Sequence, residues 1–366
     1  MKYISQLDGV RAIAVISVII SHWAPKGWMI TKFTKLFNGV DVFFVLSGFL
    51  ITMILLHNRE KTALTEHRNG TVMKSFFMRR ALRIFPIYYL ALAIIYFIGD
   101  DSNTDIRSNY LYFFTYTSNF YFFQMQSWNG MLSHLWSLSV EEQFYLVWPW
   151  LMLYCKKKHV LPVILVSIFT GLLFQLIFKN VYLAGILTFT CLDAFGVGAL
   201  LAYIQVNNPS FFHERYKWIL AIGVVSLALM ILHFNYRLDY LSARNLTAVF
   251  MFWLIVEILL KGEKKSFLPN YVFNNPLLVF MGKISYGLYL YHMMIPHFTR
   301  DFLFQMNSHL PAGLSYHNNH LVHLENFILL IGISYLSYLY IEMPFLGLKK
   351  RFEYRKASTE EKVLAV

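Results

Sequence analysis

Long apolar runs recur through almost the whole of this chain, and they constrain its fold more than any other feature. About ten are evident, each near the ~20 residues that a helix needs to cross a bilayer. They cover 10–24, 40–56, 82–98, 135–154, 160–178, 182–204, 218–234, 246–260, 276–295 and 327–341. With 57% hydrophobic and 14% charged residues, the chain has too little polar surface for a soluble globule. We therefore expect an all-α polytopic membrane bundle of about ten transmembrane helices.

Lysine and arginine collect at alternate connections between these runs. The basic groups lie at 59–83, 156–158, 213–217, 261–265 and 349–355. Short basic loops stay on the cytoplasmic side, so both termini are expected there. The alternation requires segment 110–123, which is aromatic but interrupted by polar residues, to be re-entrant or interfacial rather than a span. The net charge of +12 then follows from topology, and no nucleic-acid partner is needed.

The domain organisation predicted from these patterns is simple. Residues 1–348 should form one integral membrane domain, and 349–366 a basic and polar cytoplasmic tail. The two cysteines, Cys155 and Cys191, have neither metal-ligand nor disulfide spacing, so we interpret them as packing residues. We expect no metal site and no appended soluble domain.

Two ionisable residues, Arg11 and His22, stand inside the first apolar run. Eleven residues make about three full helical turns, so both side chains share one face, roughly 16 Å apart along the axis. Ionisable groups inside a span usually face a protein interior or a wet cavity. The pair therefore predicts a polar cavity and a candidate active site.

Two aspartates near the helix starts each have two interpretations. Asp8 could fix the guanidinium of Arg11, three residues later, or cap the first helix. Asp41 begins the second run at the same membrane depth as His22. Its carboxylate could belong to the candidate active site, or it could interact favourably with the helix dipole.

Arg80 and Arg83 stand three residues apart on one face at the cytoplasmic mouth of the third run. Paired guanidiniums suit the phosphates of a nucleotide-bearing donor such as coenzyme A. Anchoring on lipid headgroups explains the same pattern.

The fourth run begins with the densest polar stretch of any span. His134, Ser137 and Glu141 share one helix face. Because Glu142 points about 100° away from Glu141, only one of the two glutamates is expected to face the cavity. A carboxylate there could orient His22, or it could carry protons in a transporter.

These segments resemble the acyltransferase-3 family, bacterial membrane enzymes that O-acylate envelope sugars and some secondary metabolites. The resemblance rests on six motifs in order: LDGVRA with His22, GVDVFFVLSGFLIT (39–52), RALR (80–83), HLWSLSVEEQFY (134–145), ISYGLYLYH (284–292) and EMPF (342–345). The chain has Cys191-Leu192-Asp193 where many relatives place a basic residue first, so no role is transferred to Asp193. Some relatives also carry a soluble SGNH-type domain, which this chain is expected to lack.

The resemblance implies an O-acyltransferase of the bacterial inner membrane. Arg11 and His22 correspond to the family's Arg-x10-His pair, and Arg80 and Arg83 to its Arg-x-x-Arg pair. Acetyl-CoA, or another acyl-CoA, is the implied cytoplasmic donor substrate, and no permanently bound cofactor is expected. The implied acceptor is a hydroxyl of an extracytoplasmic carbohydrate such as lipopolysaccharide or exopolysaccharide. Alternatives are a small secreted metabolite such as a macrolide, or a glycolipid transporter without enzymatic activity.

The predicted mechanism joins these residues. The three arginines hold the CoA headgroup, and neutral His22 takes the proton of the attacking hydroxyl, with Glu141 or Glu142 orienting its ring. His22 could instead accept the acyl group itself. His292, in the tyrosine-rich ninth run, is a supporting candidate whose more common role is packing. The acceptor, the acyl length and the oligomeric state stay open.

Overall fold

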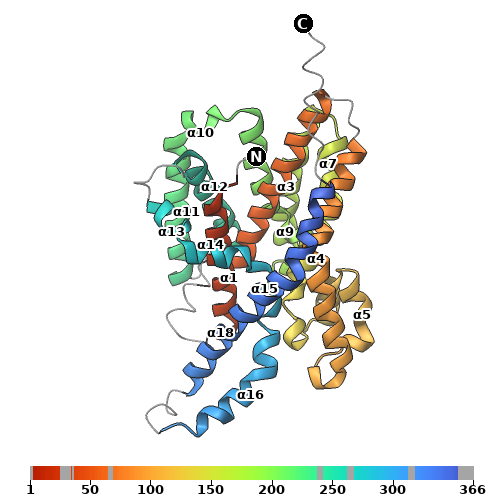
Figure 1. Ribbon diagram of the computed structural model, residues 1–366. Coiled ribbons are helices and arrows are strands. Elements are labelled where there is room, and N and C mark those ends of the chain that lie inside the picture. The colour runs from red at the N-terminus through yellow and green to blue at the C-terminus, as the bar shows by residue number, and fades with distance from the viewer. Residues whose placement is uncertain are drawn as a thin grey trace.

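A computed structural model describes residues 3–24, 34, 37–64, 69–236, 242–261, 268–311 and 318–352. These parts of the chain are almost entirely helical, with no strand among them. Long helices run side by side, and α1 (Ser5–Trp23) and α3 (Gly39–Leu64) lie near the middle of the bundle (Figure 1). The predicted all-α membrane bundle is confirmed.

The described helices follow the apolar runs closely. Those that carry or flank the site are α4 (Asn69–Ile98), α7 (Leu135–Tyr154), α9 (Thr188–Asn207), α12 (Ala243–Lys261), α13 (Leu268–Phe273), α14 (Pro276–Lys283) and α15 (Ser285–Tyr291). The outer ones are α8 (Val160–Ile177), α10 (Ser210–Glu214), α11 (Tyr216–Tyr236), α16 (Met294–Ser308), α18 (Asn318–Ser337) and α19 (Met343–Gly347).

Seven of the described helical stretches are long and apolar enough to cross a membrane, against the ten runs read from the sequence. The three others each contain polar residues or breaks. Helix α1 includes Asp8, Arg11 and His22, and α7 includes two adjacent glutamates. The run 276–295 is broken into α14, α15 and the start of α16. All three of these segments carry candidate site residues, whereas Asp41, Arg80 and Arg83 lie on helices apolar enough to span.

The aromatic segment that could not be a full span forms a short helical hairpin. Helices α5 (Ile106–Phe114) and α6 (Ser118–Met125) have 9 and 8 residues. At about 1.5 Å per residue, neither reaches half of a ~30 Å hydrocarbon layer. The predicted interruption at 110–123 is confirmed.

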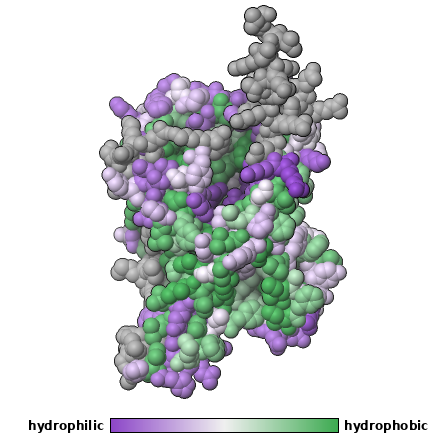
Figure 2. Space-filling model, in the orientation of Figure 1, coloured by the Kyte–Doolittle hydropathy of each residue, from purple (hydrophilic) through white to green (hydrophobic). Residues whose placement is uncertain are grey.

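An apolar surface covers the middle of the molecule on the face seen in Figure 2. Figure 2 shows a broad hydrophobic band across the bundle, with hydrophilic residues gathered above and below it. Many large apolar side chains are exposed among the described residues, including Phe169, Leu176 and Trp218. A surface of this kind suits lipid, because a water-soluble protein rarely exposes such large apolar patches.

The last described segment contains a π-helical turn and a short 3-10 helix. A π-helical turn (Tyr338–Glu342) follows α18 and places Glu342 in a buried position, and Leu348–Phe352 then packs against α4. The Ser75 hydroxyl donates to the Phe352 carbonyl. The expected tail after 352, with Arg355, lies outside the described residues, as do Arg68, Lys264 and Lys265 of the basic groups.

Close contact between α3 and α9 holds the centre of the bundle together. A Cβ atom added at Gly198 would stand 2.0 Å from the Val45 carbonyl oxygen, and one at Gly48 would stand 2.0 Å from that of Phe195. Between these glycines, the Phe195 ring stacks on Phe44 and Phe144, with centroids 4.7 and 4.2 Å away. Small residues allow membrane helices to pack at this range.

Gly198→Ala should therefore destabilise the bundle, because its new methyl group overlaps backbone and not a flexible side chain. Overpacking of this kind typically costs about 1–3 kcal/mol. Thermal unfolding of the detergent-purified protein should show a lower Tm. Gly332→Ala on α18, where a Cβ meets nothing within 4 Å, is the matched control and should leave the Tm nearly unchanged. Equal Tm values for the two variants would contradict the packing argument.

Candidate active site

Three cavities follow one another through the bundle, along α1 and α3. The first, of about 520 Å³, lies where α1 begins, and the third, of about 340 Å³, lies where α1 ends. A middle cavity of about 90 Å³ shares Arg11, Arg80 and Arg83 with the first. It shares Val40 and Tyr289 with the third. We call them the arginine, middle and histidine cavities.

The arginine cavity is strongly cationic. Five positively charged side chains and a single carboxylate, that of Asp8, line it. The cations are Arg11, Arg79, Arg80, Arg83 and Lys349. The sequence predicted that Arg11, Arg80 and Arg83 act together, and the structure places all three at this cavity. Such a wall suits a ligand with several phosphate charges.

Asp8 fixes the guanidinium of Arg11. Arg11 Nη1 donates to Asp8 Oδ1 at 2.8 Å, and the Tyr3 hydroxyl donates to Oδ2 of the same carboxylate. No side-chain capping bond is present at the start of α1. Of the two interpretations of Asp8, the structure favours the ion pair over the cap, because the carboxylate is turned along the helix toward Arg11.

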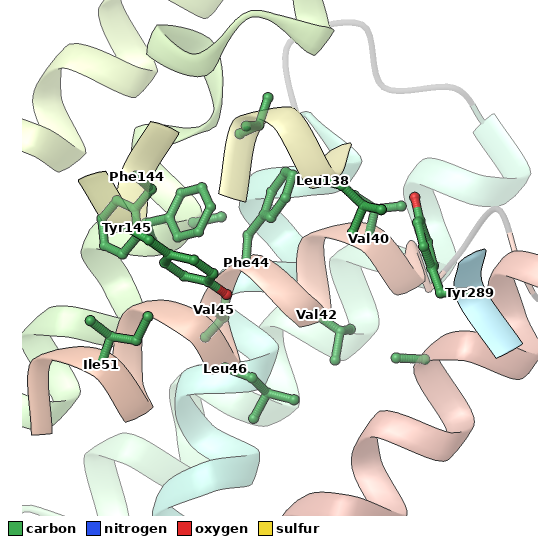
Figure 3. Close-up of a cluster of buried hydrophobic side chains, with 14 of the residues drawn as sticks. Val40, Val42, Phe44, Val45, Leu46, Ile51, Leu138, Phe144, Tyr145 and Tyr289 are labelled. Carbon is green, nitrogen blue, oxygen red and sulfur yellow. The ribbon is translucent and has the colours of Figure 1, made fainter. Parts of the chain in front are cut away.

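A polar network from three helices lines the middle cavity. The Ser47 hydroxyl on α3 donates to Glu141 Oε1 at 2.8 Å and lies 2.9 Å from the Tyr145 hydroxyl. The guanidinium of Arg80 lies over the Tyr145 ring, 5.0 Å from its centroid. Figure 3 shows Tyr145 beside Val45 on α3, with Tyr289 farther along beside Val40.

Both glutamates line this middle cavity, contrary to the expectation that only one would. Glu141 bonds to Ser47 on α3, while Glu142 lines the cavity together with Arg83 of α4 and Tyr286 of α15. The cavity lies between those helices, so side chains about 100° apart on α7 both reach it. Neither carboxylate has a recorded bond to His22 among the described residues, so the structure does not support the predicted orienting role.

His22 opens onto the histidine cavity at the end of α1. Its Nδ1 lies 2.9 Å from the Val18 carbonyl oxygen and 3.2 Å from Nε2 of His292. Nδ1 of His292 lies 2.6 Å from the Tyr289 carbonyl oxygen. Trp23 Nε1 donates to the His292 carbonyl at 2.8 Å, so the end of α1 is attached to the turn after α15 at two points.

His134 and Ser137 connect α7 to the same turn. His134 Nε2 donates to the Leu290 carbonyl at 3.0 Å, and its ring packs on His292 with centroids 4.8 Å apart. The Ser137 hydroxyl bonds to that of Tyr289. Ser137 lines the middle cavity, as Glu141 does, and His134 lines the histidine cavity. The face that these three residues were predicted to share is therefore turned toward two neighbouring cavities.

Asp41 is completely buried and pairs with an arginine that the sequence analysis did not single out. Arg244 Nε on α12 donates to Asp41 Oδ1 at 2.8 Å. The other guanidinium nitrogens donate to the carbonyls of Thr190 and Gly185. A helix-dipole role alone therefore does not describe Asp41. Its carboxylate links α3 to α12 near the wall of the histidine cavity, and Arg244 extends this link to α9.

Several residues of the site were missed because their sequence signal is weak. Ser47, Tyr145 and Tyr289 stand inside quoted motifs, but a hydroxyl among apolar residues gives no sign of its partner. Arg244 follows an ordinary polar connection, and Lys349 looks like one of the basic anchors. Only the packing of distant segments brings Ser47, Tyr145, Tyr289 and Lys349 to the cavities, and Arg244 to Asp41.

Comparison with known proteins places the chain in a family. The model of the acyltransferase-3 family, described as an acyltransferase domain, matches residues 4–342. A Staphylococcus aureus (strain COL) protein, provisionally named an O-acetyltransferase, is 30% identical over 94% of this chain and 58% of its own length. The peptidoglycan O-acetyltransferase OatA of Listeria monocytogenes is 32% identical over 80% of this chain and 49% of its own.

A third relative, from Bacillus subtilis, is provisionally named the peptidoglycan O-acetyltransferase YrhL, and is 36% identical over 40% of this chain. This chain spans about half the length of the first two relatives. No solved structure matches it. With a family match over nearly its full length, the chain belongs to the acyltransferase-3 family.

Proposed function

We propose that the protein transfers an acyl group, most simply acetyl, from cytoplasmic acyl-CoA to a hydroxyl of a cell-envelope glycan on the other side of the membrane. The observation that carries this proposal is the line of three cavities, which joins a cationic chamber to His22 through the interior of the bundle.

The arginine cavity supports the donor assignment. Coenzyme A carries a diphosphate and a 3′-phosphate at one end and its thioester at the far end of a long flexible arm. Five cations against one carboxylate suit the phosphate end. The middle cavity, with Ser47, Ser137 and Glu141 on its wall, gives the arm a polar path toward His22.

The membrane orientation follows the positive-inside rule. The arginine cavity lies on the side of the basic connections, and these are expected to be cytoplasmic. Both termini and the donor are then cytoplasmic, in the inner membrane of a bacterium. The histidine cavity lies at the other end of α1, where it would receive an acceptor from outside.

The chemistry proposed for His22 is general-base catalysis. His22 takes the proton of the acceptor hydroxyl while the oxygen attacks the thioester carbon. The C–S bond breaks, and the CoA thiolate recovers the proton from His22, so atoms and charge balance. A covalent acyl-His22 is the alternative route, which a hydroxylamine-sensitive label absent from His22→Asn would reveal.

The relatives support an envelope glycan as acceptor, since two of them carry peptidoglycan in their names. The experiment compares alkali-labile O-acyl groups on the envelope polysaccharides of a deletion strain complemented with wild type or His22→Ala. Ester restored by wild type alone is the expected result. Ester restored equally by His22→Ala would contradict the role of His22. If neither protein restores it, the glycan acceptor is wrong and acylated secreted metabolites should be sought.

Replacing Arg80 and Arg83 together by alanine should weaken donor binding. Each lost charge-assisted hydrogen bond contributes about 1.5–3 kcal/mol, so KM for acyl-CoA should rise at least tenfold. Steady-state kinetics of the purified protein provide the measurement. Arg215→Ala, an exposed arginine of another basic connection, is the control for simple lipid anchoring and should keep the wild-type KM. A double variant with unchanged KM would assign the pair to lipid contact instead.

A further inference from the structure

We infer that His292 is a positioning residue for His22, holding its ring and accepting a hydrogen bond from it while His22 carries the proton of the acceptor. This inference rests on the proposed function of His22. It starts from the chain of contacts that runs from the Tyr289 carbonyl through His292 to His22.

The chemistry of the partners fixes the direction of each hydrogen bond. A carbonyl oxygen only accepts, so Nδ1 of His292, 2.6 Å from the Tyr289 oxygen, must carry a hydrogen. In a neutral imidazole the other nitrogen, Nε2, is then an acceptor. The same argument applies to His22, whose Nδ1 lies 2.9 Å from the Val18 carbonyl oxygen. Nδ1 of His22 is thus a donor that Val18 and His292 share.

Two consequences follow for His22. Its Nε2 keeps a free lone pair, which is what a general base needs at the histidine cavity. When Nε2 takes a proton, the ring becomes positively charged, and the bond from Nδ1–H to His292 becomes charge-assisted and stronger. His292 therefore occupies the place that an aspartate has in a Ser-His-Asp triad, but as a neutral acceptor.

The surroundings hold His292 in a single orientation. Its side chain is completely buried, and its backbone carbonyl accepts from Trp23, the residue that follows His22. On the other side, His134 donates to the Leu290 carbonyl and packs on the His292 ring. A residue that only fills space needs no hydrogen bonds. His292 instead donates from Nδ1 to the Tyr289 carbonyl and accepts at Nε2 from His22.

The test compares His292→Leu, which removes the acceptor, with His292→Gln, whose side-chain oxygen can replace it. In His292→Leu, kcat should fall about 10- to 100-fold with KM for acyl-CoA unchanged, because the donor cavity is not touched. His292→Gln should recover most of the loss. His297→Leu, an exposed histidine on α16, is the matched control and should behave as wild type.

A second readout does not depend on acyl transfer. Diethyl pyrocarbonate attacks a free imidazole nitrogen, and the rate at which it labels His22 can be followed by peptide mass spectrometry. The labelling rate of His22 should fall several-fold in His292→Leu, because the ring loses the acceptor that stabilises its positive charge when Nε2 reacts. The rate should recover in His292→Gln.

Wild-type kcat and labelling in His292→Leu would overturn the inference, as would a His292→Gln variant as impaired as His292→Leu. If wild type transfers no acyl group, the proposed function fails, and the labelling rates alone decide on His292.

Discussion

Charged side chains inside an apolar bundle must face one another or water, and the rest of this structure depends on that constraint. An ionisable group exposed to hydrocarbon costs at least about 2.5–3.5 kcal/mol. Arg11, Arg80, Glu141 and His22 therefore turn inward from three different helices, α1, α4 and α7. The inward faces of these helices line the cavities that connect the two ends of the bundle. The outer surface in Figure 2 is largely apolar and suits contact with lipid.

Close helix packing converts this polar interior into a site with defined geometry. Gly48 and Gly198 bring α3 against α9, and Gly282 brings α14 against the Asp8 backbone of α1. The Asp41–Arg244 pair then fastens α3 to α12 next to the histidine cavity. These contacts fix the start of α3, and together with the bond from Trp23 to the His292 carbonyl they anchor α1 near both of its ends. On this view, Arg11 and His22 can act at opposite ends of one substrate because both ends of α1 are anchored.

The sequence predicts those parts of the site that depend on a single helix. The shared face of Arg11 and His22 follows from helical periodicity, and the motif order identifies the family. What it misses depends on contacts between helices. The contacts of the glutamates and the Arg244 partner of Asp41 are set by neighbours distant in the chain. The choice between cap and ion pair at Asp8 is local, but helical periodicity alone does not decide it. His292 illustrates the limit: a histidine in a tyrosine-rich span more often packs than acts in catalysis, and only the turn beside Trp23 reveals its contact with His22.

The proposed function requires donor and acceptor to meet inside the bundle from opposite sides of the membrane. The most direct measurement uses proteoliposomes with labelled acetyl-CoA outside and a glycan acceptor sealed inside. We expect acetyl ester on the enclosed glycan, and loss of that ester with His22→Ala. Ester formed only when donor and acceptor share one side would contradict it.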